Sequence, residues 1–278
     1  MVEVFWILLT VASSCGLLGS TLVVRNQGML ADALSHSVLL GIVLGFFISQ
    51  SLESPLLVIG ATGFGVLSVF VIRSLHRPKL AEDAATGLVF TFFFALAVLL
   101  ISLFARNVHL DMDMVLMGEV IFAPLNRVAF GTISLPLALV KAVVLLFLNS
   151  LFLLLTYQPL KCYLFDASQA RLTGVRTGLL DTGLLLLVSL TTVVSFESVG
   201  SMTVIVFLLA PAMTALPWSR SWGHLLGMGQ LVVFVSTFLA YLVAVSFDLT
   251  MSGMCAVVSL VLVCVSIFLK QLWRVLIF

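Results

Sequence analysis

Long apolar runs, each of roughly twenty residues, alternate with short polar segments along almost the whole chain. The runs are continuously apolar, whereas the strands of an outer-membrane barrel alternate apolar and polar residues over about ten positions. The pattern therefore predicts about nine membrane-spanning helices. They are expected at Val4–Val24, Ala31–Ser49, Pro55–Ile72, Ala84–Phe104, Val128–Leu155, Gly178–Val194, Val199–Leu216, Leu225–Val245 and Met251–Leu269.

The composition supports an integral membrane protein. Hydrophobic residues make up 62% of the 278 residues and charged residues 9%, against about 25% charged residues in a typical soluble domain. With this many spans no room is left for a separate soluble domain, so residues 1–278 are expected to form a single all-α transmembrane domain. The net charge of +1 provides no basic field for nucleic acid. The four cysteines form no CxxC pair and are expected to be inert packing residues.

The positions of the basic residues predict an orientation. Ten of the 13 lysines and arginines fall in every second connection, and Arg106 and Arg127 are the basic residues of the opposite set. Because cytoplasmic loops carry the excess of positive charge, the N-terminus is expected outside and the C-terminus in the cytoplasm. The cytoplasmic set comprises Arg25, Arg73, Arg77, Lys79, Lys161, Arg171, Arg176, Arg220, Lys270 and Arg274.

An acid and a histidine interrupt the second apolar run, GMLADALSHSVLLGIVLGFF. Asp32 and His36 are four residues apart and share one face of the predicted helix. Ionisable groups in a membrane are costly and often mark an ion route. A carboxylate with an imidazole suits Mn, Fe or Zn, and two ligands leave the ion free to depart. Alternatively, Asp32 caps the helix and His36 hydrogen-bonds a neighbouring helix.

Three further polar or helix-breaking residues lie within or beside apolar runs. Glu197, near the outer end of the sixth predicted span, is a candidate outer gate or metal relay, or a plain interfacial residue. Pro211 is expected to bend its helix. Lys141 can snorkel to a membrane surface or pair with an acid such as Asp181.

Two connections are longer than simple turns. Residues 106–127 mix apolar and acidic positions, which predicts a short interfacial or re-entrant helix ending near Pro124. His109, Asp111 and Asp113 in this connection form either a metal cluster or a set of solvated loop residues.

The second long connection, residues 157–177, contains the segment FDASQARLTGV. Its residues from Asp166 to Leu172 predict a short helix outside the membrane, with Asp166 as the N-cap and Gly174 as the stop. Such a helix can dock on a partner, or it can be an ordinary surface element.

Four segments, in this order, resemble the permease subunits of metal-ion ABC importers of the zinc, manganese and iron group. The stretch ADALSHSVLLG resembles the family pattern GDALSHAVLPG and departs from it at Ala31 and Leu40. The stretch AEDAATGLVF matches through Glu82, Asp83 and Gly87. The stretch FDASQARLTGV matches through Asp166, Ala170 and Gly174. The stretch SVGSMTVIVFLLAPAMTA matches the family's late span, and its matching residues are Val199, Gly200, Pro211, Ala212 and Ala215.

The resemblance implies a helical permease of the vitamin-B12-importer type that works as a pair around a central pathway. It implies a cytoplasmic ATPase, an external metal-binding protein and a second permease copy or paralogue as partners, in the inner membrane of a bacterium. It further implies an ATPase-coupling segment through Asp166, Ala170, Arg171 and Gly174. The residues that it implies along the pathway or its gates are Ser35, Glu82, Asp83 and Pro211.

The sequence offers little support for other classes of protein. It contains no GxxxxGK[ST] loop, so the energy for an importer must come from another subunit. It contains neither HExxH nor GxSxG, and Ser35 and His36 point about 100° apart on a helix, which argues against a hydrolase. An ion-coupled secondary metal transporter is the remaining alternative and would be expected to contain inverted repeats.

Overall fold

The computed structural model describes residues 2–50, 54–75, 82–104, 120–121, 123–130 and 133–277. Within these ranges, nine helices are long and apolar enough to cross a membrane. The elements are α1 (Val2–Val24), α2 (Gly28–Ser49), α3 (Pro55–Leu75), α4 (Glu82–Phe104), η1 (Ala123–Leu125), β1 (Arg127–Phe130), β2 (Ile133–Pro136), α6 (Leu137–Leu155), α7 (Tyr157–Phe165), α8 (Ala167–Leu172), α9 (Thr177–Val199), α10 (Ser201–Ala215), η2 (Leu216–Trp218), α11 (Trp222–Phe247) and α12 (Met251–Ile277).

Each predicted span corresponds to one of these long helices, but several boundaries are wrong; α12, for example, continues to Ile277 instead of ending at Leu269. The fifth span begins at Leu137 and not at Val128, because β1 and β2 precede it as an antiparallel pair of strands, in which Arg127 pairs with Pro136. A short apolar run does not distinguish a strand from a helix, which explains the error. The sixth span continues to Val199, where Gly200, with a φ of 84°, separates α9 from α10.

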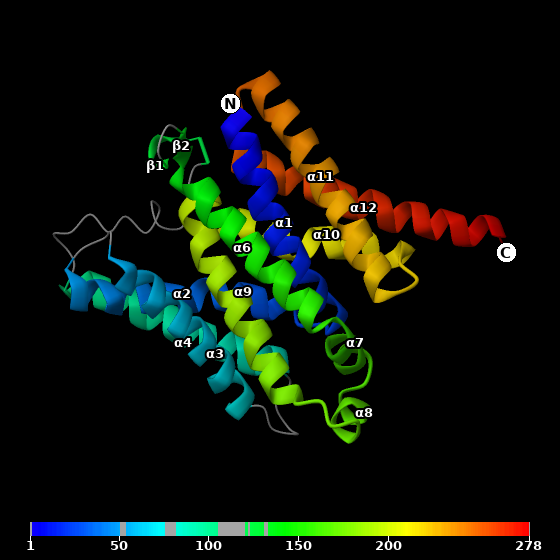
Figure 1. Cartoon of the computed structure of the whole chain (residues 1–278), viewed down its shortest axis with the longest axis horizontal. Coiled ribbons are helices and arrows are strands. Elements are labelled where there is room, and N and C mark those ends of the chain that lie inside the picture. The colour runs from blue at the N-terminus through cyan, green and yellow to red at the C-terminus, as the bar shows by residue number, and fades with distance from the viewer. Residues whose placement is uncertain are drawn as a thin grey trace.

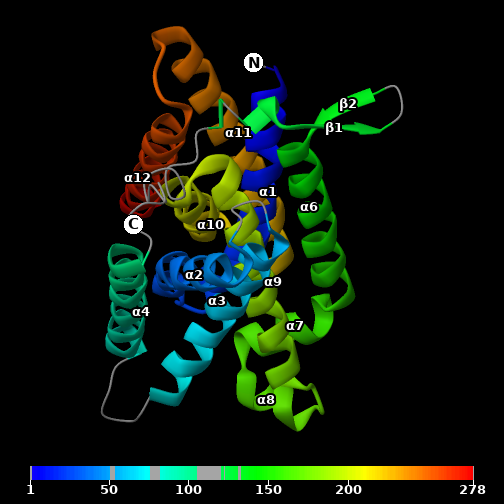
Figure 2. The same ribbon diagram turned by 90° about the vertical axis from the view of Figure 1, so that its left-hand side faces the viewer.

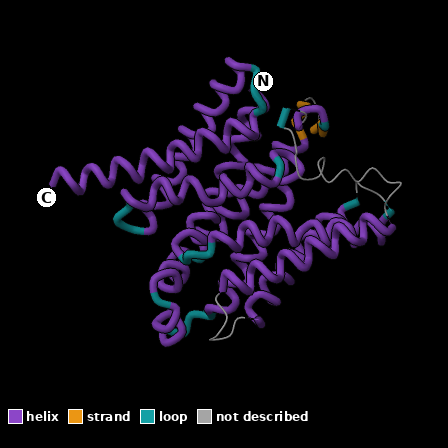
Figure 3. Tube along the Cα trace, turned by 180° about the vertical axis from the view of Figure 1, so that it is seen from behind, coloured by secondary structure: helices purple, strands orange, loops and turns teal. Residues whose placement is uncertain are grey.

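The long helices form two groups. In the first group, α6, α9, α10 and α11 pack around α1 (Figure 1). The second group consists of α2, α3 and α4, and in Figure 2 α4 lies at the edge of the molecule. It contacts α2 and α3. Seen from behind, the chain is almost entirely helical, with the small hairpin near the N-terminus (Figure 3). One large apolar core surrounds α1, and a smaller one lies between α2, α3 and α4.

Two helix crossings depend on glycine. A side chain at Gly19 of α1 would overlap the main-chain carbonyl of Leu208 on α10. A side chain at Gly41 of α2 would overlap the main-chain carbonyl of Gly60 on α3. Small residues that let helix backbones approach are a principal source of helix association in membranes. The two crossings therefore hold α1 against α10 and α2 against α3 at backbone distance.

A buried polar cluster joins three helices of the larger core. The side-chain amide of Asn149 on α6 donates to Ser14 Oγ on α1 (2.8 Å) and to Thr191 Oγ1 on α9 (2.9 Å). All three side chains are buried. Hydrogen bonds between membrane helices contribute about 0.6 to 1.7 kcal/mol each. This cluster was not predicted from the sequence, although the asparagine within the apolar run of α6 is a visible signal of a polar contact.

The Asn149→Ala substitution is expected to lower the thermal unfolding temperature of the detergent-solubilised protein. It removes two interhelical hydrogen bonds, at a cost of about 1 to 2 kcal/mol. The control is Ser102→Ala, since the exposed Ser102 hydroxyl bonds within its own helix, to the Leu99 carbonyl. Equal unfolding temperatures for the two variants would contradict the predicted role of Asn149.

Candidate metal site

Helix α2 places Asp32 and His36 together. Its N-cap is Gln27, so Asp32 lies inside the helix and does not cap it, which removes one alternative interpretation of this acid. His36 Nε2 is 3.5 Å from Asp32 Oδ1, a separation longer than that of a good hydrogen bond. The side chains remain 31% and 42% exposed, respectively. The two potential ligand atoms therefore converge on a point that is open to exchange.

The His36 ring also contacts two aromatic side chains of α4. The Phe90 ring is stacked on it, with the ring centroids 5.5 Å apart and an interplanar angle of 24°. The Phe94 ring meets it edge to face, at 5.2 Å and 75°. The neighbouring helix α4 thus presents two aromatic rings to His36. Neither phenylalanine was predicted from the sequence, because their contact with His36 depends on how α4 packs against α2.

The structure describes the side chains of two other predicted pathway residues, Ser35 and Pro211. Ser35 is buried, and its hydroxyl donates to the Ala31 carbonyl of its own helix (2.9 Å). Pro211 is buried within α10, as expected. Glu82 and Asp83 begin α4, and their side chains lie outside the described set. Among the described residues, no group of three or more His, Cys, Asp and Glu side chains could hold a metal ion.

Glu197 forms an ion pair with Lys141. Its Oε2 accepts a hydrogen bond from Lys141 Nζ (2.6 Å), linking the end of α9 to the start of α6. Lys141 therefore pairs with an acid, as one of the two alternatives expected, but the acid is Glu197 and not Asp181. Asp181 lies near the opposite end of α9 from Glu197, so the antiparallel course of α6 brings Lys141 to Glu197 instead. The predicted cluster of His109, Asp111 and Asp113 lies outside the described residues.

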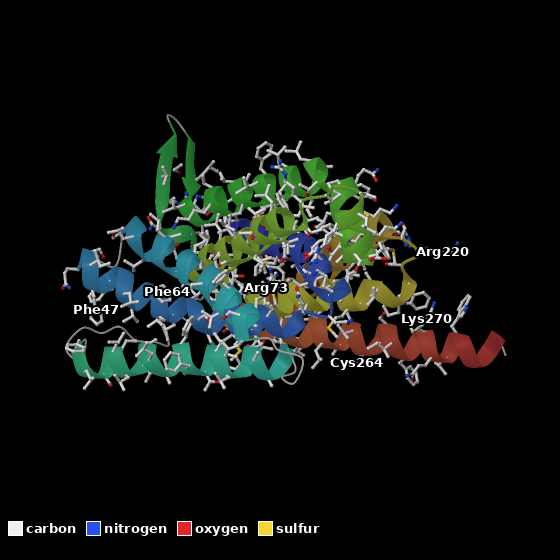
Figure 4. The ribbon with its side chains drawn as sticks, turned by 90° about the horizontal axis from the view of Figure 1, so that it is seen from below. Phe47, Phe64, Arg73, Arg220, Cys264 and Lys270 are labelled. Carbon is white, nitrogen blue, oxygen red and sulfur yellow. The ribbon has the colours of Figure 1, made fainter. Side chains whose placement is uncertain are left out.

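Asp181 is buried between two arginines. Its Oδ1 accepts from Arg25 Nη1, at the end of α1 (2.5 Å), and its Oδ2 pairs with Arg73 of α3. Arg73 is labelled in Figure 4. The Arg25 guanidinium also lies 5.0 Å from the ring centroid of Tyr163 on α7. Burial raises the pKa of the Tyr163 hydroxyl, and the charge of Arg25 acts in the opposite direction. We call Arg25, Asp181 and Arg73 the arginine–aspartate cluster.

The expected short helix is confirmed as α8. Asp166 is its N-cap and accepts hydrogen bonds from the main-chain N–H groups of Ser168 (2.8 Å) and Gln169 (3.0 Å). At its end Gly174 has a φ of 80°, and the Val175 N–H donates to the Ala170 carbonyl (3.0 Å), as in a Schellman motif. The helix is thus fixed at both ends.

The surface of this segment combines charge with apolar side chains. Ala170 is buried and anchors α8, while Arg171 is exposed. Phe165 at the end of α7 and Leu172 at the end of α8 are 68% and 88% exposed. Large apolar groups beside a charge on a segment outside the spanning helices are typical of a contact surface for another protein.

Comparison with known proteins identifies the family. A model of the ABC 3 transport family matches residues 1–271. The chain belongs to the ABC 3 transport family. Family membership confirms the predicted class, a multi-pass membrane subunit of a bacterial transport system.

Curated relatives cover much of the chain. It is 38% identical over 252 residues to the "Manganese transport system membrane protein MntD" of Bacillus subtilis (strain 168), covering 89% of this chain and 85% of the relative. It is 44% identical over 210 residues to the "Zinc transport system membrane protein TroD" of Treponema pallidum (strain Nichols), covering 75% of this chain but 57% of that longer relative.

A solved structure of similar fold supports the architecture. PsaBC from Streptococcus pneumoniae, determined in complex with Fab, aligns with a TM-score of 0.81 at 21% identity. The alignment covers 99% of this chain and 94% of that chain. The likeness confirms the all-α integral membrane fold of this ABC 3 transport family member.

Proposed function

We propose that this chain is the permease subunit of an ABC importer that moves a divalent transition-metal ion, Mn, Fe or Zn, into the cell. The observation that carries the proposal is the convergence of Asp32 and His36 on one open point within a membrane-spanning helix. Two relatives are named for manganese and zinc transport, which supports the cargo class.

The geometry of the pair suits a transported ion. Two ligand atoms at 2.0 to 2.2 Å from one metal ion lie about 2.8 to 3.6 Å apart, for ligand angles between the octahedral 90° and the tetrahedral value. The observed separation of 3.5 Å falls at the upper end of this range. Both side chains are partly exposed, so water or a second set of ligands can complete the coordination and the ion can leave.

Partner proteins are proposed to supply the energy for transport and the remaining parts of the ion pathway. A cytoplasmic ATPase is proposed to dock on the segment containing Asp166, Ala170, Arg171 and Gly174, where the exposed apolar side chains support a protein contact. Closure of the ATPases would push on α8 and switch the side on which the pathway opens. An external metal-binding protein would deliver the ion, and a second permease copy or paralogue would complete the pathway. Glu197 remains a proposed relay at the outer end of α9.

The proposed setting is the inner membrane of a bacterium, with residues 1–278 as one permease domain in contact with lipid. We place the N-terminus outside and the C-terminus in the cytoplasm. The meeting of Arg25 and Arg73 at the start of α9 supports this orientation, because both belong to the predicted cytoplasmic set.

The proposal is tested by metal uptake in cells that lack other uptake systems and express the permease with its ATPase and binding protein. Asp32→Ala and His36→Ala are each expected to reduce the uptake of radiolabelled Mn²⁺ or Zn²⁺ at least tenfold, since each removes one of two ligands. Matched controls are Asp248→Ala and His224→Ala, at exposed positions outside the pair.

Two outcomes would contradict the proposal. Undiminished uptake by well-expressed Asp32→Ala and His36→Ala variants would remove the site assignment. Full uptake after the ATPase subunit is omitted would instead indicate an ion-coupled secondary metal transporter.

A further inference from the structure

We propose that Phe90 and Phe94 of α4 are positioning residues that hold the His36 imidazole ready for metal capture. This inference rests on the proposed function and extends it to a helix that contributes no metal ligand of its own to the pair. It begins from the two ring contacts, one stacked and one edge to face, that α4 makes with His36.

The two contacts restrict different movements of the same ring. The Phe90 ring lies within 24° of parallel to the imidazole, at a centroid distance of 5.5 Å, and opposes its tilting. The Phe94 ring is nearly perpendicular to the imidazole, at 5.2 Å, and opposes its movement toward α4. Both arrangements are favourable for aromatic pairs. Together they limit the side-chain torsions that His36 can adopt.

This restriction leaves the metal-facing side free. Nε2 points toward Asp32, and the His36 side chain is still 31% exposed. The phenylalanines therefore fix the ring without covering the atom that binds the ion. A ligand that is already oriented loses less conformational entropy on binding, which strengthens binding without adding a contact to the ion.

The packing of α4 explains how the two phenylalanines reach this position. Phe90 and Phe94 are four residues apart, so they share one face of α4, and both pack against the smaller apolar core. Phe93, which lies beside them on α4, is buried and contacts Phe64 of α3. In Figure 4, α4 runs along the edge of the bundle, where it flanks α2 and α3. Phe92, by contrast, is 60% exposed.

The test measures uptake as a function of metal concentration in the complete transporter. Phe90→Leu and Phe94→Leu are each expected to raise the half-saturating concentration of Mn²⁺ or Zn²⁺ about three- to tenfold, the equivalent of one freed side chain. The maximal rate is expected to stay near the wild-type value. Phe90→Tyr keeps the ring and is expected to restore the wild-type half-saturating concentration. Phe92→Leu is the matched control on the exposed face.

A second measurement keeps the test independent of transport rates. Binding of Co²⁺ to the purified permease, followed by its visible absorption, is expected to weaken by the same factor in Phe90→Leu and Phe94→Leu. Binding that is unchanged in these variants would overturn the inference. The inference would also be overturned if Phe90→Leu, Phe94→Leu and the control Phe92→Leu all lowered the maximal rate and the expression equally. That result would indicate that the phenylalanines contribute only to the general packing of α4.

The outcomes separate this inference from the proposed function. If Asp32→Ala and His36→Ala abolish uptake while the Phe90 and Phe94 variants behave as wild type, the positioning role alone is wrong. If uptake survives the loss of Asp32 and His36, the proposed function fails and the positioning role fails with it.

Discussion

Substitution of Gly19 by valine is expected to abolish the folded protein. The new Cβ would overlap the Leu208 carbonyl oxygen and lie 2.5 Å and 2.9 Å from its carbonyl carbon and Cα. These are main-chain atoms of a helix, so no side-chain rotation can relieve the clash. Overpacking against movable side chains costs about 1 to 3 kcal/mol, and a clash between two backbones is expected to cost more. Helices α1 and α10 would have to separate along their crossing.

The measurement is the yield of monodisperse protein after solubilisation and size-exclusion chromatography. Gly19→Val and Gly19→Ala are both expected to give aggregate or no protein, because the Cβ that overlaps Leu208 is present in both variants. Gly227→Val is the matched control, because a Cβ at this position of α11 would meet nothing within 4 Å. A monodisperse Gly19→Val protein that unfolds at the wild-type temperature would refute the proposed close crossing.

Removal of Asp181 is expected to have the second-largest effect, on stability. Asp181→Ala leaves the Arg25 and Arg73 guanidinium groups facing each other without their shared carboxylate. Breaking a buried ion pair by removing one partner costs about 3 to 5 kcal/mol. Because the Arg73 side chain is 39% exposed and can turn toward water, a value near the lower end is expected. The unfolding temperature of the detergent-solubilised protein measures this loss.

Two further variants sharpen the test. Asp181→Ala combined with Arg25→Met and Arg73→Met is expected to recover much of the lost stability, since no unpaired charge remains. Glu197→Ala removes the acid of the pair with Lys141, in which the Lys141 side chain is 35% and the Glu197 side chain 58% exposed. Its expected cost in unfolding free energy is about 1 kcal/mol or less. If Asp181→Ala costs no more than Glu197→Ala, the arginine–aspartate cluster contributes little to stability.

Most of the fold was predictable because each membrane span must be apolar along its whole length. The exception, the hairpin before Leu137, shows the limit of that rule. Its residues are apolar enough to extend the following span, and hydropathy alone carries no information about backbone pairing. The local structure of α8 was predictable for a different reason, since an N-cap and a stop glycine act through their own main-chain neighbours.

The partners of the site residues were less predictable. Asp32 and His36 could be paired from the sequence, because a helix alone brings positions four apart together. The contacts of His36 with Phe90 depend on the register between two helices, which no local pattern specifies. The pairing of Lys141 with Glu197 could have been predicted from the sequence. The alternating direction of successive spans places both residues at the same end of the bundle.

The arginine–aspartate cluster also constrains how the sequences of such proteins can diverge. A mutation that removes Asp181 first leaves two opposed cations, whereas loss of the half-exposed Arg73 leaves Asp181 paired with Arg25. Divergence is therefore expected to begin at the position of Arg73. A relative that lacks the aspartate is expected to lack at least one of the arginines as well, so the three positions should covary.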